Sequence, residues 1–168
     1  MTRFILIFMS VLVVLFSVEM LNSVQLALIQ PFTHSLAVVS SALILPFDPN
    51  VIAYGKIIQN QENGFAVSIE AGCNGVEAVI MLFAAVVAFP APWKSKVIVI
   101  LGGFLAIQVL NIGRIISLFY LGQWHSGIFE WAHLYIWPVM IMVDVLIVFL
   151  VWLKYLPKTV DEELGPES

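Results

Sequence analysis

Charged residues are scarce in this sequence. Of its 168 residues only 7 are Lys or Arg and 11 are Asp or Glu, which makes 11% charged against 61% hydrophobic. A soluble domain has about 25% charged and about 45–50% apolar residues. A water-soluble fold of this length cannot bury so much apolar surface. The composition therefore predicts an all-α polytopic membrane protein, with residues 1–168 forming a single membrane-embedded domain.

Cysteine is nearly absent, because Cys73 is the only one. A single thiol excludes an internal disulfide, a CxxC redox pair and a zinc-finger site. Basic residues form no cluster, so we expect no binding to nucleic acid, and we also expect no metal and no cofactor. Four of the eleven acidic residues lie in the C-terminal segment Asp161–Glu167, which we interpret as a solvated tail rather than a partner site.

Four apolar runs are candidates for membrane-spanning helices, which need about 20 residues each. The second run reaches that length only if its helix begins near Gly72. No small-x-small cleavage site follows the first run, so we interpret residues 1–30 as an uncleaved N-terminal anchor. The four runs are Phe4–Leu21, Val76–Phe89 with its flanks, Val97–Leu118 and Trp131–Leu153.

The basic residues predict the orientation in the membrane, because Lys and Arg accumulate in cytoplasmic loops. Arg3 precedes the first run, Lys94 and Lys96 separate the second from the third, and Lys154 and Lys158 follow the fourth. With four crossings all five lie on one side, which we interpret as the cytoplasm. We therefore expect a multi-pass protein of the cytoplasmic (inner) membrane, in contact with the lipid bilayer, with residues 154–168 as a cytoplasmic acidic tail.

Residues 31–72 are expected on the extracytoplasmic side. The stretch Pro31–Pro46 is apolar but short, and a crossing there would invert all that follows, so we interpret it as an interfacial or re-entrant helix. Phe65–Glu70 alternates apolar and polar residues as a half-exposed strand does, and Val51–Ile58 is its expected partner. A small β-hairpin should therefore lead into the second span.

Three residues with complementary chemistry lie at the extracytoplasmic ends of the last three spans. Cys73 opens the second span, and Arg114 and His133 lie roughly 27 Å and 32 Å of helix from the cytoplasmic lysines of their own spans. A thiolate is a nucleophile, imidazole can transfer protons and guanidinium can stabilise an oxyanion. Residues 73–153 are therefore predicted to form a catalytic core of three helices.

Each of these residues also has a structural interpretation. A lone cysteine is more often a small apolar residue than a nucleophile. Arg114 could reach lipid phosphates or pair with an acidic residue, and His133 could form a hydrogen bond at the membrane interface. The coincidence of all three at one depth favours the functional interpretation.

Four further polar residues are candidates for a supporting role. Glu77 lies one turn deeper on the helix face that carries the cysteine, where it could pair with the arginine. Glu130 lies three residues before the histidine and could orient it. Asn74 and Asn111 could form hydrogen bonds near the site.

These motifs, in this order on three successive helices, resemble the exosortase/archaeosortase family. The segments that carry the resemblance are Glu70–Gly75 (EAGCNG), Asn111–Ile115 (NIGRI) and Ala132-His133. The short chain and the segment Pro31–Thr33 are similar to the compact branch called exosortase H. The resemblance covers roughly residues 30–153, and it implies that the catalytic Cys, Arg and His of the family correspond to the three residues proposed above.

The resemblance also implies a function. Family members are polytopic sortase analogues that cleave the C-terminal sorting tags of exported proteins, and each tag has a short motif, a transmembrane helix and a basic end. For this branch the motif is expected to be similar to Ile-Pro-Thr-Leu. We therefore expect a cysteine endopeptidase or transpeptidase whose active site faces the extracytoplasmic side. A membrane thiol acyltransferase and a non-enzymatic scaffold or transporter subunit are the alternatives, and the acceptor nucleophile and the oligomeric state stay open.

Overall fold

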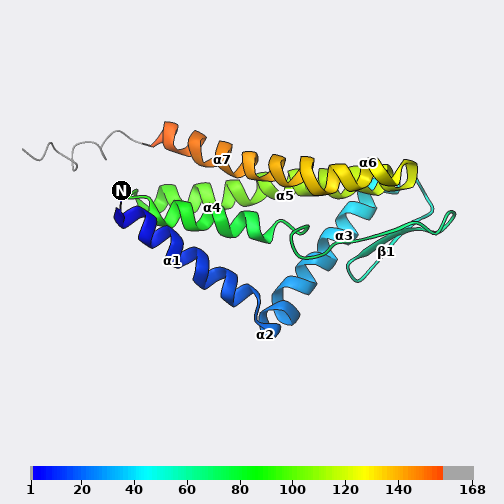
Figure 1. Cartoon of the computed structure of the whole chain (residues 1–168), viewed down its shortest axis with the longest axis horizontal. Coiled ribbons are helices and arrows are strands. Elements are labelled where there is room, and N and C mark those ends of the chain that lie inside the picture. The colour runs from blue at the N-terminus through cyan, green and yellow to red at the C-terminus, as the bar shows by residue number, and fades with distance from the viewer. Residues whose placement is uncertain (1, 157–168) are drawn as a thin grey trace, which may run out of the picture.

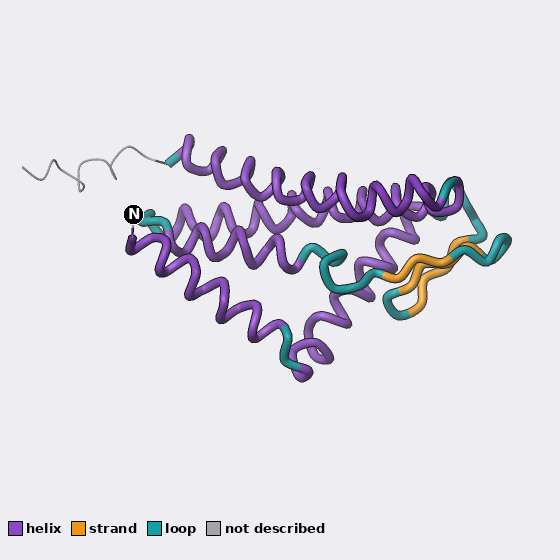
Figure 2. Tube along the Cα trace, viewed as in Figure 1, coloured by secondary structure: helices purple, strands orange, loops and turns teal. Residues whose placement is uncertain are grey.

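The computed structural model describes residues 2–156, which form a helical protein with a small sheet near one end (Figures 1 and 2). The predicted acidic tail, residues 154–168, is described only to residue 156, where its first two residues belong to the last helix, and Lys158 lies outside the described residues. In chain order the elements are α1 (Thr2–Glu19), α2 (Asn22–Val24), the π-helix η1 (Gln25–Ile29), α3 (Gln30–Ile44), β1 (Val51–Tyr54), β2 (Ile57–Asn60), β3 (Ala66–Ser68), α4 (Val76–Ala88), α5 (Trp93–Trp124), α6 (Ser126–Trp131), the π-helix η2 (Ala132–Ile136) and α7 (Trp137–Tyr155).

The helices α4, α5 and α7 lie side by side, with α5 antiparallel to the other two, and α1 packs against α4 (Figure 1). One core cluster joins the three helices through apolar side chains such as Leu82, Ile107 and Ile141. The helices approach closely at Gly103, where an added Cβ would lie 2.3 Å from a methyl carbon of Leu82 and 2.9 Å from one of Val148. The predicted all-α polytopic fold is confirmed.

Within residues 2–156, four helical segments are long and apolar enough to cross a membrane, as predicted, but they are not the predicted four. The predicted second span is the 13-residue helix α4, which begins at Val76 and not near Gly72. The predicted interfacial helix is longer than expected, because it is continuous from Asn22 to Ile44. The remaining segments, Thr2–Glu19, Trp93–Trp124 and Ser126–Tyr155, agree with the predicted first, third and fourth spans.

The helix α3 lies towards the end of the molecule that holds the sheet. It diverges from α1 at the elbow formed by α2 and η1, and it leads away from the end where α1 begins (Figure 1). Its buried face, with Leu36 and Ile44, packs in a second core cluster with Ile115 and Phe119 from the C-terminal half of α5. The helices α1 and α3 therefore lie along different parts of the bundle, and α3 packs beside the sheet.

The start of α1, the connection between α4 and α5, and the end of α7 lie at one end of the bundle (Figure 1). Arg3, Lys94, Lys96 and Lys154 belong to these segments. The sheet and the loop that carries Cys73 lie away from this end (Figure 2). The basic residues are thus separated from the candidate site along the helix axes, as their spacing predicted.

The sheet has three antiparallel strands in the order β1-β2-β3, and not the two that were predicted. The expected strand Val51–Ile58 is split, because Gly55 has a φ of +56° and the chain reverses there. A positive φ costs little at glycine, so this position permits a tight hairpin turn. The central strand β2 pairs with β1 on one side and with β3 on the other.

Gly75, which precedes α4, should be among the positions most sensitive to substitution. It has a φ of +77°, and an added Cβ would lie 2.9 Å from Nε2 of Gln108 and 3.4 Å from the side chain of Asn111. Backbone strain and overpacking together should make Gly75→Ala lower the free energy of unfolding by about 1–3 kcal/mol. The measurement is thermal unfolding in detergent micelles, followed by circular dichroism.

Gly55→Ala is the matched control for this prediction, because Gly55 also has a positive φ but has no atom within 4 Å of the added Cβ. Gly55→Ala should therefore show only the backbone strain, about 1 kcal/mol. Equal losses in the two variants would contradict the packing contribution at Gly75.

Candidate active site

Cys73 lies in the tight loop that connects β3 to α4. Gly72 and Gly75, on either side of it, have φ values of +80° and +77°. The Cys73 N–H donates to the carbonyl of Glu70 at 2.9 Å, which closes the turn. Asn74 is buried, and its Oδ1 accepts a hydrogen bond of 3.0 Å from the N–H of Val76 in the first turn of α4. The loop therefore holds Cys73 half-buried in a defined position.

The side chain of Arg114 contacts the Cys73 thiol directly. Its Nη2 donates to Sγ at 3.3 Å, and its Nη1 donates to the carbonyl of Gly72 at 3.0 Å. Arg114 lies on α5 and is only 3% exposed. Because the two guanidinium nitrogens bond to adjacent residues of the loop, the charge is fixed beside the sulfur. The structure thus brings together the two residues that helix lengths had placed at one depth.

His133 lines the same pocket as Cys73 and Arg114, which has a volume of about 300 Å³. It lies on η2 and forms no hydrogen bond within residues 2–156, where its Nδ1 is buried without a partner. The ring of Phe129 stacks on the imidazole, with centroids 5.7 Å apart and an interplanar angle of 2°. The imidazole is therefore held by stacking, with its ring nitrogens not committed to another described residue.

Of the four supporting candidates, only Asn74 forms the hydrogen bonds near the site that were expected of it. Glu77 accepts a hydrogen bond from the Gly72 N–H and forms no ion pair with the arginine. Glu130 is exposed and has no hydrogen bond to the histidine among the described residues. Asn111 is fully buried beneath Gly75, and both polar atoms of its side chain lack a partner within residues 2–156. Asn74 accepts a hydrogen bond from the N–H of Val76, as described above, and its Nδ2 lies 3.5 Å from the hydroxyl of Thr33.

Two contacts of the site were missed by the sequence analysis. Phe129 precedes the histidine by four residues, which is one helical turn and places the two rings on one face. Lys56 pairs with Glu70 and so joins the β1–β2 turn to the start of the Cys73 loop. Lys56 is the only lysine or arginine between residues 31 and 72, and this is the feature of the sequence that could have predicted an ion pair there.

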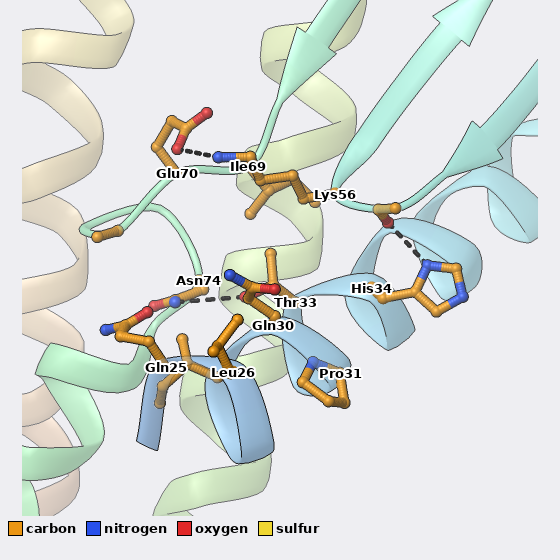
Figure 3. A pocket seen from close by; sticks show the side chains of 13 residues that line it. Gln25, Leu26, Gln30, Pro31, Thr33, His34, Lys56, Ile69, Glu70 and Asn74 are labelled. Carbon is orange, nitrogen blue, oxygen red and sulfur yellow. Dashed lines mark hydrogen bonds and ion pairs between the residues drawn. The ribbon is translucent and has the colours of Figure 1, made fainter. Parts of the chain in front are cut away.

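A larger cavity of about 560 Å³ lies next to the Cys73 loop, with Glu70 and Asn74 in its lining (Figure 3). It is bounded by the α2–η1–α3 elbow, with Gln25 and His34, and by the ion pair of Lys56 and Glu70. The two cavities share the backbone stretch 69–71. Both cavities therefore lie against the same backbone stretch, directly before the thiol.

Burial raises the pKa of the Cys73 thiol above its ordinary value, while the charge of Arg114 opposes this shift and that of Glu77 adds to it. Because only the thiolate is alkylated rapidly, Cys73 should react slowly with iodoacetamide at neutral pH. Its rate should rise only at a pH above the range in which a free cysteine peptide titrates. Arg114→Gln should move this rise to a still higher pH, and a titration at or below that of the peptide would contradict the prediction.

No group of three or more His, Cys, Asp or Glu side chains within residues 2–156 could hold a metal ion. The chemistry available to the pocket is that of a thiol, a fixed cation and an imidazole. The fold and the pocket together define a polytopic membrane protein with a thiol–guanidinium pair near one end of its helix bundle.

The chain belongs to the transmembrane exosortase family, because the model of this family, Exosortase_EpsH, matches residues 1–153. No curated protein and no solved structure matches the chain. The resemblance seen in the sequence motifs is therefore confirmed at the level of the family. This family is implicated in the processing of sorting signals, and its members are membrane proteins.

Proposed function

We propose that the protein is a membrane-embedded cysteine peptidase or transpeptidase that removes C-terminal sorting tags from exported proteins. The observation that carries the proposal is the direct contact of the Arg114 guanidinium with the Cys73 thiol, in a pocket that His133 also lines. The tagged substrate places its transmembrane helix beside the bundle and its motif at the outer face of the cytoplasmic membrane. Membership of the exosortase family supports this choice of substrate.

In the first step the sulfur of Cys73 attacks a carbonyl carbon of the substrate, and the thiol proton passes to His133. The carbonyl electron pair moves to oxygen, and the resulting oxyanion is stabilised by the N–H groups of Arg114. When the intermediate collapses, the C–N bond breaks and His133 returns its proton to the leaving amine. The tag departs, and the remainder of the substrate is held as a thioester on Cys73.

In the second step water or an acceptor amine or hydroxyl attacks the thioester. His133 takes the proton of this nucleophile, the C–S bond breaks, and the proton returns to the sulfur so that the thiol is restored. Water yields a free carboxylate, whereas another acceptor yields a new ester or amide bond. A raised thiol pKa agrees with this sequence, because the proton then leaves sulfur during the attack and not before it.

The test uses a co-expressed membrane protein with an Ile-Pro-Thr-Leu-type motif, a transmembrane helix and a basic end. We expect loss of the tag only when the enzyme is present, and the intact mass of the product distinguishes water from another acceptor. An intact tag beside a folded and inserted enzyme would count against the proposal. Labelling of Cys73 by a lipid acyl group in the absence of any tag would favour the thiol acyltransferase instead.

A further inference from the structure

The strand β3 is an edge strand, and it lies along the pocket that contains Cys73. The order β1-β2-β3 leaves one side of β3 without a partner strand in the described chain. All three of its residues line the pocket. An edge strand presents unpaired N–H and C=O groups that can bind another extended chain.

The hydrogen bonds at the two ends of β3 show which of its groups face outward. The Phe65 carbonyl accepts from the N–H of Asn60, and the Ile69 N–H donates to the carbonyl of Lys56, both at 2.9 Å. Odd-numbered residues of this segment therefore direct their backbone groups towards β2. Because these groups alternate along a strand, those of Ala66 and Ser68 point to the open edge.

The rest of the pocket has the form of a groove beside this edge. The second wall consists of Phe129 and His133 from α6 and η2, and Ile115 and Leu118 of α5 also line it. Cys73 and Arg114 lie in the same cavity. An extended peptide in this groove would have backbone partners on one side, apolar side chains on the other, and the thiol within reach.

We propose that the motif of the substrate binds in this groove as an additional β-strand beside β3, bonded to the backbone of Ala66 and Ser68, and so presents its carbonyl to Cys73. This inference rests on the proposed function. It also predicts the phase of the bound motif. The proline, which is the second residue of an Ile-Pro-Thr-Leu motif, has no N–H. Its backbone must therefore be directed away from β3. The backbone N–H and C=O groups of the first and third residues are then directed towards β3.

The phase is tested with two N-methylated peptides that contain the motif and the purified full-length protein in detergent micelles. Methylation of the Thr nitrogen removes a hydrogen bond to β3, so kcat/KM should fall roughly tenfold or more. Methylation of the Leu nitrogen, which faces away, should change kcat/KM by less than about threefold, because no hydrogen bond is lost. Equal effects of the two methyl groups would overturn the inference.

The enzyme side is tested with Ser68→Pro, which removes an outward N–H and leaves the β2–β3 hydrogen bonds in place. KM should rise roughly tenfold with little change in kcat, because one backbone hydrogen bond to the substrate is lost. Ser68→Ala keeps the N–H and loses only the hydrogen bond of the Ser68 hydroxyl to Glu70, so its KM should rise much less than that of Ser68→Pro. Ala53→Pro makes the same change at the outward edge of β1, and an equal rise in KM there would contradict a specific role for β3.

A measurement that does not depend on catalysis separates this inference from the proposed function. The double variant Cys73→Ala, Ser68→Cys has a single cysteine, at position 68. A second cysteine is placed at each position of the motif in turn in a tagged membrane protein, so each disulfide that forms can be assigned. We expect cross-links at alternate motif positions. No cross-link, or equal ones at every position, overturns the added strand even if wild type cleaves. Alternating cross-links without cleavage by wild type would support the added strand and overturn the proposed peptidase.

Discussion

Replacing Cys73 by alanine should lower the rate of tag removal by roughly four orders of magnitude or more. The thiol is the only cysteine of the chain, and the proposed thioester cannot form without it. The rate is measured on the tagged test protein by intact mass, in membranes that contain equal amounts of each variant. Cys73→Ser should lose nearly as much, because a serine hydroxyl beside a cation is a far weaker nucleophile than a thiolate.

The controls for this prediction follow from the contacts of the loop. The arginine keeps its 3.0 Å hydrogen bond to the carbonyl of Gly72 when the sulfur is removed, so Cys73→Ala should fold and insert. Equal thermal unfolding midpoints of wild type and variant would exclude a folding defect. If a folded Cys73→Ala still removed the tag, the thiol mechanism would be excluded and another group of the protein would have to act as the nucleophile.

The similar depth of Cys73 and Arg114 could be predicted from the sequence because it depends on distances along helices. The rise per residue of an α-helix is nearly constant, so counting from the basic residues gives the depth of each side chain. The structure places Nη2 of the arginine 3.3 Å from the sulfur. Counting along helices does not give rotation about their axes, and the expected pair of Glu77 with the arginine accordingly fails, since its carboxylate binds the Gly72 N–H.

Proline explains one of the two wrong helix boundaries, the start of the helix that contains Pro31. Pro31 was taken as the start of a short helix, but it lies in the first turn of α3 directly after the π-helix Gln25–Ile29, and the helical path continues through both. Proline is tolerated at the start of an α-helix because its missing N–H is not needed there. Pro138 follows the π-helix Ala132–Ile136 in the same way. Neither π-helix has a pattern of apolar residues that differs from that of an ordinary helix.

The third strand and the surroundings of His133 depend on contacts that no local pattern encodes. The split of the first expected strand required a positive φ at Gly55, which a glycine permits but does not demand. Glu130 was expected to orient the histidine, yet the structure places Phe129 against the imidazole ring. Both residues are within one helical turn of the histidine, and only the packing of α6 and η2 against the pocket decides between them.

Arg114 is the second residue at which a large effect is expected, and a series of substitutions separates its charge from its hydrogen bonds. Arg114→Gln can still donate to the carbonyl of Gly72, but it has no charge to stabilise the oxyanion. Its kcat should fall by about 10²–10³-fold with KM little changed, as for the loss of an oxyanion donor. Arg114→Lys keeps a charge but cannot form the two hydrogen bonds of the guanidinium at once. Its kcat should therefore fall less, by about 10–10²-fold.

The measured split between kcat and KM decides what the arginine does in the reaction. A guanidinium that only holds the substrate in place would raise KM in Arg114→Gln and leave kcat unchanged. If the guanidinium had only a structural role, every substitution of Arg114 would lower the unfolding midpoint. Any variant that still folds would then keep the activity of wild type. A loss confined to kcat, in a folded Arg114→Gln whose thiol also titrates at a higher pH, would assign the charge to both the thiolate and the oxyanion. That result would explain why a buried cation lies against a single thiol in the interior of this protein.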